Sequence, residues 1–228
     1  MTCPLCLHDQ FEPLATSDAK SGEPLQVAMC THCGLIQQTP VPSDEELKIY
    51  YSHNYRTDYK NTYAPKPKHV LRAARTARER VAFLHAAGVN NGTLLDVGAG
   101  GGEFTYVSSR MGFDSTGVEP NMGYSEYAQQ EYGCDVRTGQ IGELQGEYDV
   151  VTIFHVMEHL PSPLKAFEKL RSLLKPDGTL FVEVPWIETN DASPHNIYFK
   201  AHIFYFSIDT LVACASPRSS ETVMPLPT

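Results

Sequence analysis

The chain has 228 residues, of which 42% are hydrophobic and 20% are charged, so it can bury one sizeable core and carry a small additional module. Its formal net charge of −9 at pH 7 argues against general binding to nucleic acid or to anionic membranes, because both need a basic face. The N-terminal residues lack the basic and apolar regions of a secretion signal, and no window holds about 18 uninterrupted apolar residues. We therefore expect a cytoplasmic protein.

Two pairs of cysteines lie near the N-terminus. Cys3 and Cys6 form the first pair, and Cys30 and Cys33 form the second pair after 23 intervening residues. Paired thiolates at this spacing are typical of a tetrahedral zinc site, which lets a segment too small for its own core fold around the ion. Four cysteines leave no open coordination position, so we expect a structural zinc in a module over residues 1–42. Redox dithiols or free thiols are the alternative.

Residues 43–91 are expected to form a helical linker and lid. Ser43 is a suitable N-cap, with Glu46 three residues later as its capping-box partner. Tyrosines then recur every four residues, at Tyr51, Tyr55, Tyr59 and Tyr63. On a helix they would share one face, which indicates either packing or a lid over a ligand pocket. The spacing of apolar residues predicts a further helix from Pro67 to a stop at Gly88.

Beyond residue 92, short apolar runs of strand length alternate with helical stretches. The runs are "TLLDVG", "STGVEP", "YDVVTIF" and "TLFVEVP", with a weaker run near "CDVRTG". The stretch "PSPLKAFEKLRSLLKPDG" is expected to be helical. This alternation implies βαβ crossovers. We therefore predict an α/β fold in which a Rossmann-like parallel sheet flanked by helices occupies residues 92–215, after the small N-terminal zinc-binding module.

A glycine-rich turn, "LLDVGAGGGEF", ends the first of these strands. Glycines there permit a tight turn and the close approach of a ligand. Glu103 stands where a dinucleotide-binding fingerprint has its last glycine. A carboxylate near the positive end of a helix suits a cation or a zwitterion better than a pyrophosphate. Glu119 ends the next strand and could bind both hydroxyls of a ribose, so the two features indicate a nucleoside without phosphates.

Together, "LDVGAGGGEF", "GVEP" and "YDVVTIFHVMEHLPSP…LRSLLKPDGTLFVEVP" resemble the class I S-adenosylmethionine-dependent methyltransferases over about residues 92–212. The cysteine pairs ahead of them resemble those of a subgroup with an N-terminal zinc-binding module, which includes sugar C-methyltransferases acting on nucleotide-linked deoxysugars. The resemblance implies S-adenosylmethionine as the cofactor and a small-molecule acceptor, of which a nucleotide-linked sugar is one candidate. Oligomeric state stays open.

The resemblance also implies cofactor-binding residues at the carboxyl ends of the strands. The strand end before the glycine turn would belong to the cofactor site, the glycine turn would contact the methionine moiety, and the carboxylate of the second strand would bind the ribose. Residues after the third strand would flank the adenine, and those after the fourth would line the methyl-donor end. In that order they are Asp96, Gly98, Ala99 and Gly100; Glu119 and Pro120; Gln140 and Ile141; Phe154 and His155.

Methyl transfer requires aligned reactants, and a base where the nucleophile carries a proton. Histidine is the usual base, so His202 and His155 are the catalytic candidates, with His155 the more readily interpreted as pocket lining. The sugar C-methyltransferases that the chain resembles have Tyr-x-Glu-His ahead of a similar "YFS" run, whereas this chain has Phe199-Lys200-Ala201-His202. Because the tyrosine and the glutamate are missing, carbon, oxygen and nitrogen acceptors all stay open.

The segment "HVMEH", residues 155–159, has the spacing of a zinc-peptidase motif. That motif requires a long helix, whereas here His155 directly follows a strand and Pro161 opens the next helix. We interpret the segment as the loop after the fourth strand.

After a helix in "FSIDTLVACA", capped by Ser207, residues 216–228 predict an irregular tail rich in proline and serine. Class I methyltransferases normally finish their sheet with an antiparallel hairpin, which this tail cannot form. Two alternatives to an active methyltransferase follow. One is a catalytically impaired, truncated methyltransferase-like protein that keeps cofactor or partner binding, and the other is a zinc-ribbon adaptor.

Overall fold

The structure, a computed structural model, describes residues 2–43, 46–47, 67–188 and 197–215. The chain divides into two compact units, each built from separate stretches of sequence. The first unit comprises Met1–Asn54, His155–Phe167 and Val184–Thr228, and the second comprises Tyr55–Phe154 and Glu168–Glu183. The predicted tyrosine stripe and the predicted C-terminal tail lie outside the described residues.

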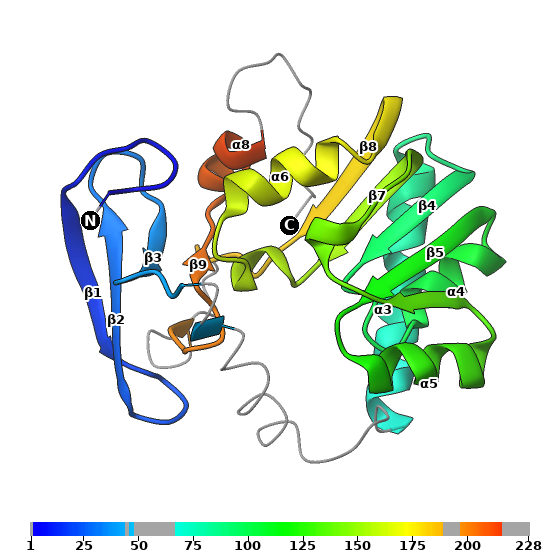
Figure 1. Cartoon of the computed structure of the whole chain (residues 1–228), viewed down its shortest axis with the longest axis horizontal. Coiled ribbons are helices and arrows are strands. Elements are labelled where there is room, and N and C mark those ends of the chain that lie inside the picture. The colour runs from blue at the N-terminus through cyan, green and yellow to red at the C-terminus, as the bar shows by residue number, and fades with distance from the viewer. Residues whose placement is uncertain (1, 44–45, 48–66, 189–196, 216–228) are drawn as a thin grey trace. The chain divides into compact units, whose positions relative to one another are not determined.

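The second unit contains a parallel five-stranded sheet with the strand order β6-β5-β4-β7-β8 (Figure 1). Its strands are β4 (Gly92–Val97), β5 (Phe113–Glu119), β6 (Asp135–Thr138), β7 (Tyr148–Phe154) and β8 (Leu174–Glu183). Its helices are α3 (Pro67–Ala86), α4 (Glu103–Arg110), α5 (Met122–Tyr132) and the short 3-10 helix η2 (Ile141–Glu143). The helix α6 (Pro163–Arg171) begins in the first unit and ends in the second. Strands and helices alternate along the chain, so the predicted Rossmann-like α/β fold is confirmed.

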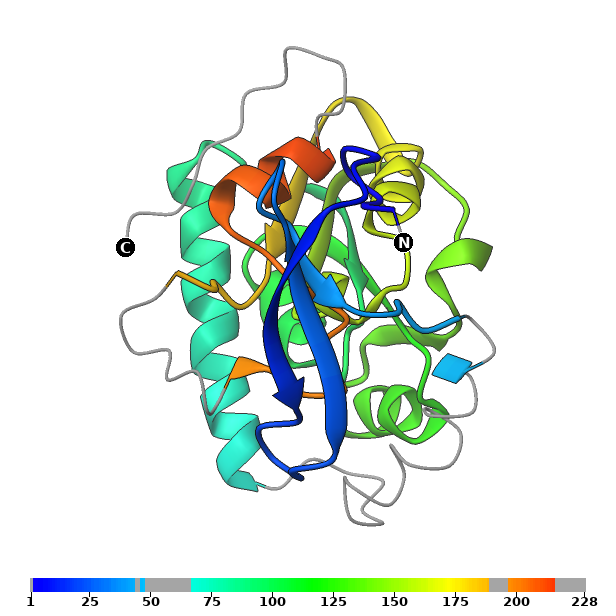
Figure 2. The same ribbon diagram turned by 90° about the vertical axis from the view of Figure 1, so that its left-hand side faces the viewer.

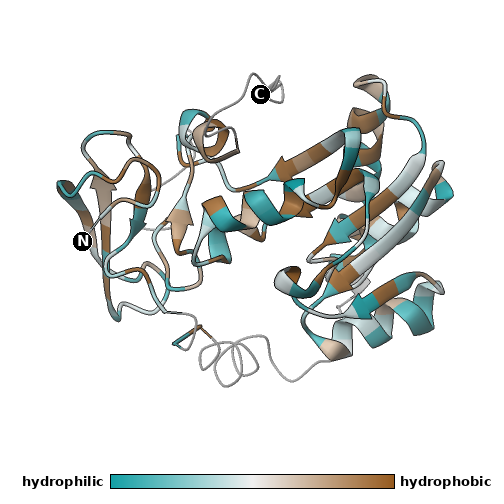
Figure 3. Cartoon of the chain, turned by 45° about the horizontal axis from the view of Figure 1, so that its top comes forward, coloured by the Kyte–Doolittle hydropathy of each residue, from teal (hydrophilic) through white to brown (hydrophobic). Residues whose placement is uncertain are grey.

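The core of this unit forms where α3 and α4 pack against the central strands. Hydrophobic residues are concentrated in the strands of the parallel sheet (Figure 3). Val81 and Leu84 on α3 are fully buried in the same cluster as Phe104 of α4, and burial of each aliphatic side chain contributes about 1.5–3 kcal/mol. As predicted, the helix stops at Gly88, which has a φ of +86°.

Gly102 allows the start of α4 to pack closely against α5. Its φ is +85°, and a Cβ atom at this position would lie 2.5 Å from the Cβ of Ala128. Only glycine satisfies both conditions. The start of α5 is fixed by Asn121, whose side chain accepts a hydrogen bond from the backbone N–H of Tyr124 at 3.2 Å.

The helix predicted to run as far as Gly178 is too long, and this prediction is wrong. Helix α6 ends at Arg171, and β8 begins at Leu174 opposite Tyr148 of β7. The pairing is irregular between Tyr148 and Val150, and Asp177 has a φ of +64°. Pro176 has no N–H to continue a helix, so the chain enters the sheet early.

The first unit contains an antiparallel four-stranded sheet with the order β1-β2-β3-β9. Its elements are β1 (Phe11–Ser17), β2 (Pro24–Cys30), β3 (Ile36–Gln38), the 3-10 helix η3 (Met157–His159), β9 (Phe204–Tyr205) and the helix α8 (Ile208–Ala215). Figure 2 shows β1 and β2 as the long hairpin of this sheet. Residues after position 154 therefore belong to the same unit as the N-terminal cysteines. The sequence analysis, in contrast, predicted modules that are each one continuous stretch of the chain.

Polar contacts hold β9 beside the N-terminal strands. The side-chain amide of Gln38 donates to the carbonyl oxygens of Lys200 and His202 at 2.9 and 2.8 Å. Asp18 accepts a hydrogen bond from the backbone N–H of Lys200 at 2.6 Å. These bonds satisfy partly buried backbone groups just ahead of β9. The predicted cap of α8 is confirmed, because Ser207 Oγ accepts from the backbone N–H of Thr210.

The predicted capping box is also confirmed. Ser43 Oγ accepts from the backbone N–H of Glu46 at 3.3 Å, and the Glu46 carboxylate accepts from the backbone N–H of Ser43 at 2.8 Å.

Among the described helices, none is long and apolar enough to cross a membrane.

Candidate functional site

The glycine turn leaves the carboxyl end of β4 in a left-handed conformation. Gly98 and Gly100 have φ values of +78° and +54°, and the backbone N–H groups of Gly98 and Ala99 donate to the carbonyl of Val118 at 2.8 and 3.0 Å. A Cβ atom at Gly100 would meet nothing within 4 Å. Glycine is therefore needed at position 100 for its backbone conformation, and the space beside it is open to a ligand.

Glu119, the last residue of β5, is tied to this turn. One carboxylate oxygen accepts from the backbone N–H of Gly100 at 3.0 Å, and the other accepts from that of Asn121 at 2.9 Å. Burial raises the pKa of Glu119 above its ordinary value, against the opposing effect of these two hydrogen bonds. Each carboxylate oxygen keeps a further lone pair, so the group can still accept hydrogen bonds from a ligand.

Asp96 lies in β4 just ahead of the turn and is 2% exposed. Its carboxylate accepts hydrogen bonds from the hydroxyls of Thr105 and Thr152, both at 3.0 Å. Burial raises the pKa of Asp96 to about 6. The side chain thus joins the end of β4 to α4 and β7.

A pocket opens beside the turn in the second unit. It is lined by Ala73, Arg80, Asp96, Gly98, Ala99, Glu103, Phe104 and Phe154. Four of the predicted cofactor residues, Asp96, Gly98, Ala99 and Phe154, therefore line one pocket. Gly100 follows Ala99 in the chain and is hydrogen-bonded to Glu119. Pro120 is exposed at the end of β5. Gln140 is exposed and Ile141 is half-buried at the start of η2, and none of these three lines the pocket.

Arg80 is a pocket residue that the sequence analysis missed. Its guanidinium makes a bidentate ion pair with Glu183 at the end of β8, in which Nε donates to Oε2 at 2.8 Å and Nη2 donates to Oε1 at 2.6 Å. Its Cζ lies 4.1 Å from the ring centroid of Phe154. The ion pair and the aromatic contact fix the orientation of Arg80. The only signals in the sequence were an arginine-rich helix face and an acidic residue at a strand end.

The segment 155–159 forms a cluster of its own in the first unit. His155 has a φ of +55° and a half-exposed side chain, whereas the side chain of Glu158 is 2% exposed. Three imidazole nitrogens surround Oε1 of Glu158: Nδ1 of His155 at 3.7 Å, Nε2 of His159 at 3.8 Å and Nε2 of His202 at 3.9 Å. The two predicted catalytic histidines therefore approach the same carboxylate, and Glu158 and His159 were missed as members of this cluster.

The local structure of this segment differs from that of a zinc peptidase. Residues Met157–His159 form one short 3-10 helix, so the interpretation of "HVMEH" as a loop after the fourth strand is confirmed. Burial lowers the pKa of His202 to about 4, with a further contribution from the neighbouring His159. The His202 imidazole is therefore neutral at pH 7.

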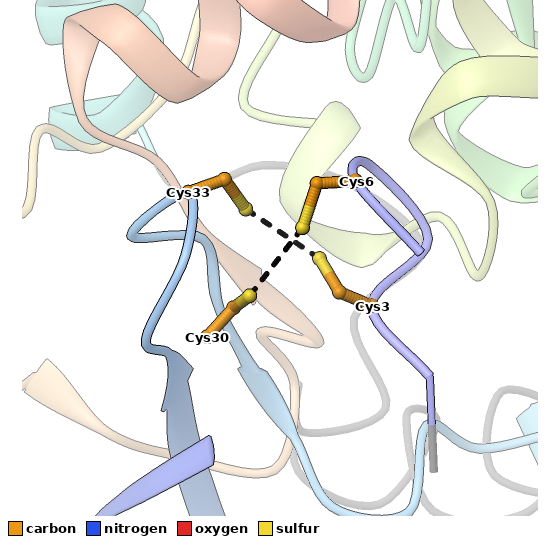
Figure 4. Close-up of side chains that lie close together, drawn as sticks. All are labelled: Cys3, Cys6, Cys30 and Cys33. Carbon is orange, nitrogen blue, oxygen red and sulfur yellow. Dashed lines mark hydrogen bonds between the residues drawn. The ribbon is translucent and has the colours of Figure 1, made fainter. Parts of the chain in front are cut away.

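The four paired cysteines converge in the first unit, and their sulfur atoms point toward one centre (Figure 4). Sγ of Cys3 lies 3.5 Å from that of Cys33, Sγ of Cys6 lies 3.5 Å from that of Cys30, and all four lie within 4.8 Å of one another. Four thiolates about 2.3 Å from one zinc ion would be separated by roughly 3.8 Å in a tetrahedron. The arrangement therefore fits a zinc ion.

A five-stranded parallel sheet of this order, a glycine turn after its central strand and a carboxylate at the end of the next strand are features of Rossmann-like nucleotide-binding domains, among them the class I S-adenosylmethionine-dependent methyltransferases. A family model described as "Methyltransferase domain" matches residues 69–216. The chain belongs to this methyltransferase family.

Relatives with curated names include ubiquinone biosynthesis O-methyltransferases. That of Acinetobacter baylyi is 34% identical over 109 residues, which cover 42% of this chain and 45% of the relative. That of Haemophilus ducreyi is 33% identical over 110 residues, which cover 42% of this chain and 47% of the relative. The matches therefore span about half the length of these relatives.

Two solved structures are similar to part of the chain at low identity. DesVI of Streptomyces venezuelae has a TM-score of 0.47 and 19% identity, and the match covers 53% of this chain and 54% of DesVI. The magnesium protoporphyrin IX methyltransferase ChlM of Synechocystis PCC 6803, with bound SAH, has a TM-score of 0.44 and 22% identity, and the match covers 58% and 68% of the two chains.

Proposed function

We propose that the protein is an S-adenosylmethionine-dependent methyltransferase that acts on a hydroxyl group of a small molecule. The observation that carries this proposal is the link between the glycine turn and Glu119, through the hydrogen bond to the Gly100 N–H at 3.0 Å. The link sets an open backbone turn beside a carboxylate that can bind ribose hydroxyls. Membership of the methyltransferase family supports the same assignment.

In this proposal the cofactor follows the carboxyl ends of the strands. Its methionine moiety lies at Gly98–Gly100, with Asp96 holding the turn in shape, and its ribose lies at Glu119 and Pro120. The adenine lies near Gln140 and Ile141, and the methyl-donor end lies at Phe154 and His155. A zwitterionic methionine moiety also suits Glu103 at the start of α4, where a pyrophosphate would meet a negative charge.

The transfer itself is a displacement at the methyl carbon of the sulfonium. The acceptor oxygen forms a bond to this carbon while the carbon–sulfur bond breaks, and the electron pair stays on the sulfur of S-adenosylhomocysteine. The acceptor proton passes to a base. We propose His155 for this role before His202, because His155 directly follows the last residue of β7 and its side chain is half exposed.

An oxygen acceptor is favoured over a carbon acceptor. The relatives that match at 33% and 34% identity are named O-methyltransferases. In addition, the chain has Phe199 and Ala201 where the sugar C-methyltransferases that it resembles have tyrosine and glutamate. A hydroxylated small molecule is therefore the proposed substrate class.

The four cysteines are proposed to hold one structural zinc ion. Thiolates from two loops fill its coordination sphere, so the ion stabilises the fold of the N-terminal strands and leaves no position for a substrate.

A methyl-transfer assay with labelled S-adenosylmethionine tests the proposed function. Catechols, other hydroxylated aromatic compounds and nucleotide sugars would be offered as acceptors, with each product identified by mass spectrometry. The proposal expects label on an acceptor oxygen and formation of S-adenosylhomocysteine. Cofactor binding without turnover on the whole panel would support the impaired-protein alternative, and absence of cofactor binding would support the adaptor.

A further inference from the structure

The strongest unexplained feature of the described residues is the carboxylate of Glu158. Its side chain is 2% exposed, and Oε2 is buried with no hydrogen-bond partner among the described residues. Transfer of a carboxylate from water to such a position costs several kcal/mol unless another group compensates its charge. A group that supplies this compensation is therefore expected beside Glu158.

The imidazoles around Glu158 do not donate hydrogen bonds to Oε1 of its carboxylate. The separations between Oε1 and the nearest nitrogens of His155, His159 and His202 are 3.7, 3.8 and 3.9 Å, whereas an N–H···O bond measures about 2.7–3.2 Å. Two ligands each about 2.1 Å from one metal ion lie roughly 3.4 Å apart in a tetrahedron and at most about 4.2 Å apart across the ion. The observed separations fall in this range.

The orientation of His159 is that of a metal ligand. Its Nδ1 lies 2.6 Å from the carbonyl oxygen of Ala201. A carbonyl only accepts hydrogen bonds, so Nδ1 carries the proton and Nε2 presents its lone pair toward Glu158. A hydrogen bond from the second ring nitrogen to a carbonyl is the usual way in which proteins fix a metal-binding imidazole.

The geometry points to a second metal site, in which Glu158, His159 and His202 bind one divalent transition-metal ion. The ligand atoms of these three residues lie within 4.8 Å of one another. Two imidazoles and one carboxylate suit Zn²⁺, Fe²⁺ or Co²⁺, and this donor set leaves coordination positions open for an oxygen ligand such as a hydroxyl group. The site is separate from the four thiolates and does not depend on the proposed function.

The proposed metal site also gives His202 and His155 different roles. A metal ion would use the lone pair on Nε2 of His202, so His202 could not accept a proton there. His155 is not one of the three ligands, so the metal site does not alter its proposed role in proton transfer. The segment "HVMEH" thus supplies two ligands of a metal site, although it lacks the helix of a zinc peptidase.

Cobalt titration of the intact chain tests the site. The protein is first loaded with one equivalent of zinc to fill the four thiolates, and Co²⁺ is then added while the visible spectrum is recorded. We expect d–d absorption that saturates at one cobalt per chain, without sulfur-to-cobalt charge transfer. The same protein should show hyperfine-shifted imidazole N–H signals in its proton NMR spectrum, which needs no variant.

Two variants sharpen the test. Glu158→Gln keeps the size of the side chain and should weaken cobalt binding by at least about tenfold. His69→Ala removes an exposed imidazole on α3 and should leave the binding unchanged. Absence of both the visible bands and the shifted NMR signals in wild type would overturn the proposal. Equal cobalt affinity of wild type and a folded Glu158→Gln variant, checked by thermal unfolding, would overturn it as well.

Discussion

The carboxylate of Glu119 accepts a hydrogen bond from the backbone N–H of Gly100 at 3.0 Å. This bond connects the carboxyl ends of β4 and β5, the two strands between which the proposed cofactor binds. Replacement of Glu119 by Gln should therefore weaken S-adenosylmethionine binding, because the amide cannot offer two charged acceptor oxygens. Hydrogen bonds to charged groups contribute about 1.5–3 kcal/mol each, so we expect a loss of at least roughly tenfold in affinity by calorimetry.

The matched control for this change is Glu126→Gln, on the exposed side of α5. It removes the same charge from a position away from the turn, so the affinity should stay at the wild-type value. Equal affinities of the Glu119 and Glu126 variants would contradict the assignment of the ribose to Glu119.

Gly102→Ala should destabilise the protein more than Gly133→Ala. Both glycines have positive φ values, +85° and +64°, and alanine in this conformation costs about 1–2 kcal/mol. At position 102 the new Cβ would also approach Ala128 to 2.5 Å, whereas at position 133 it would meet nothing within 4 Å. Overpacking adds about 1–3 kcal/mol. Urea unfolding of both variants measures the difference, and equal destabilisation would show that the close approach of α4 and α5 is unimportant.

Asp96→Asn should change the pH dependence of stability. The pKa of Asp96 is raised to about 6 in the folded protein, above its unfolded value of about 3.9. Between these two values the unfolded chain releases the proton first, so wild-type stability falls as pH rises. The stability of wild type relative to the variant should therefore fall by about 2 kcal/mol between pH 4 and pH 6 and stay nearly constant above pH 7. Urea unfolding across this range is the measurement, and a pH-independent difference is the contrary result.

Cys30→Ser should lower the zinc content by one ion per chain. Without the ion, the two loops that carry the thiolates lose their link, and β1, β2 and β3 should exchange their amide hydrogens faster. Because β3 pairs with β9 through Ile36 and Tyr205, exchange should also rise at β9, while β4 to β8 stay protected. Cys134→Ser, on the segment before β6, is the control that should keep the zinc. Unchanged metal content in Cys30→Ser would refute the four-thiolate site.

Local patterns were sufficient to predict the parallel sheet and its glycine turn. Apolar runs marked β4, β5 and β7, and Gly98 and Gly100 marked a turn whose backbone requires glycine. The pairing of Ile36 with Tyr205 left no such signal, because it joins two short segments distant in sequence. The start of β8 was missed for a related reason, since its pairing with β7 overrode the helical pattern around Leu174.

The candidate site was predicted in part. The pocket contains four of the residues that were predicted to bind the cofactor, Asp96, Gly98, Ala99 and Phe154, whereas Arg80 enters it from a helix that carries no recognisable motif. Glu158 was read only as part of a loop, because the spacing of "HVMEH" cannot show that His202, far along the chain, approaches the same carboxylate at 3.9 Å.

The most direct test of the central claim is a titration of the isotope-labelled protein with S-adenosylmethionine, followed by backbone NMR. We expect saturable one-to-one binding, with the largest shifts at the N–H groups of Gly98, Gly100 and Asn121. No binding at millimolar cofactor, or binding that leaves these three amides unshifted, would contradict it.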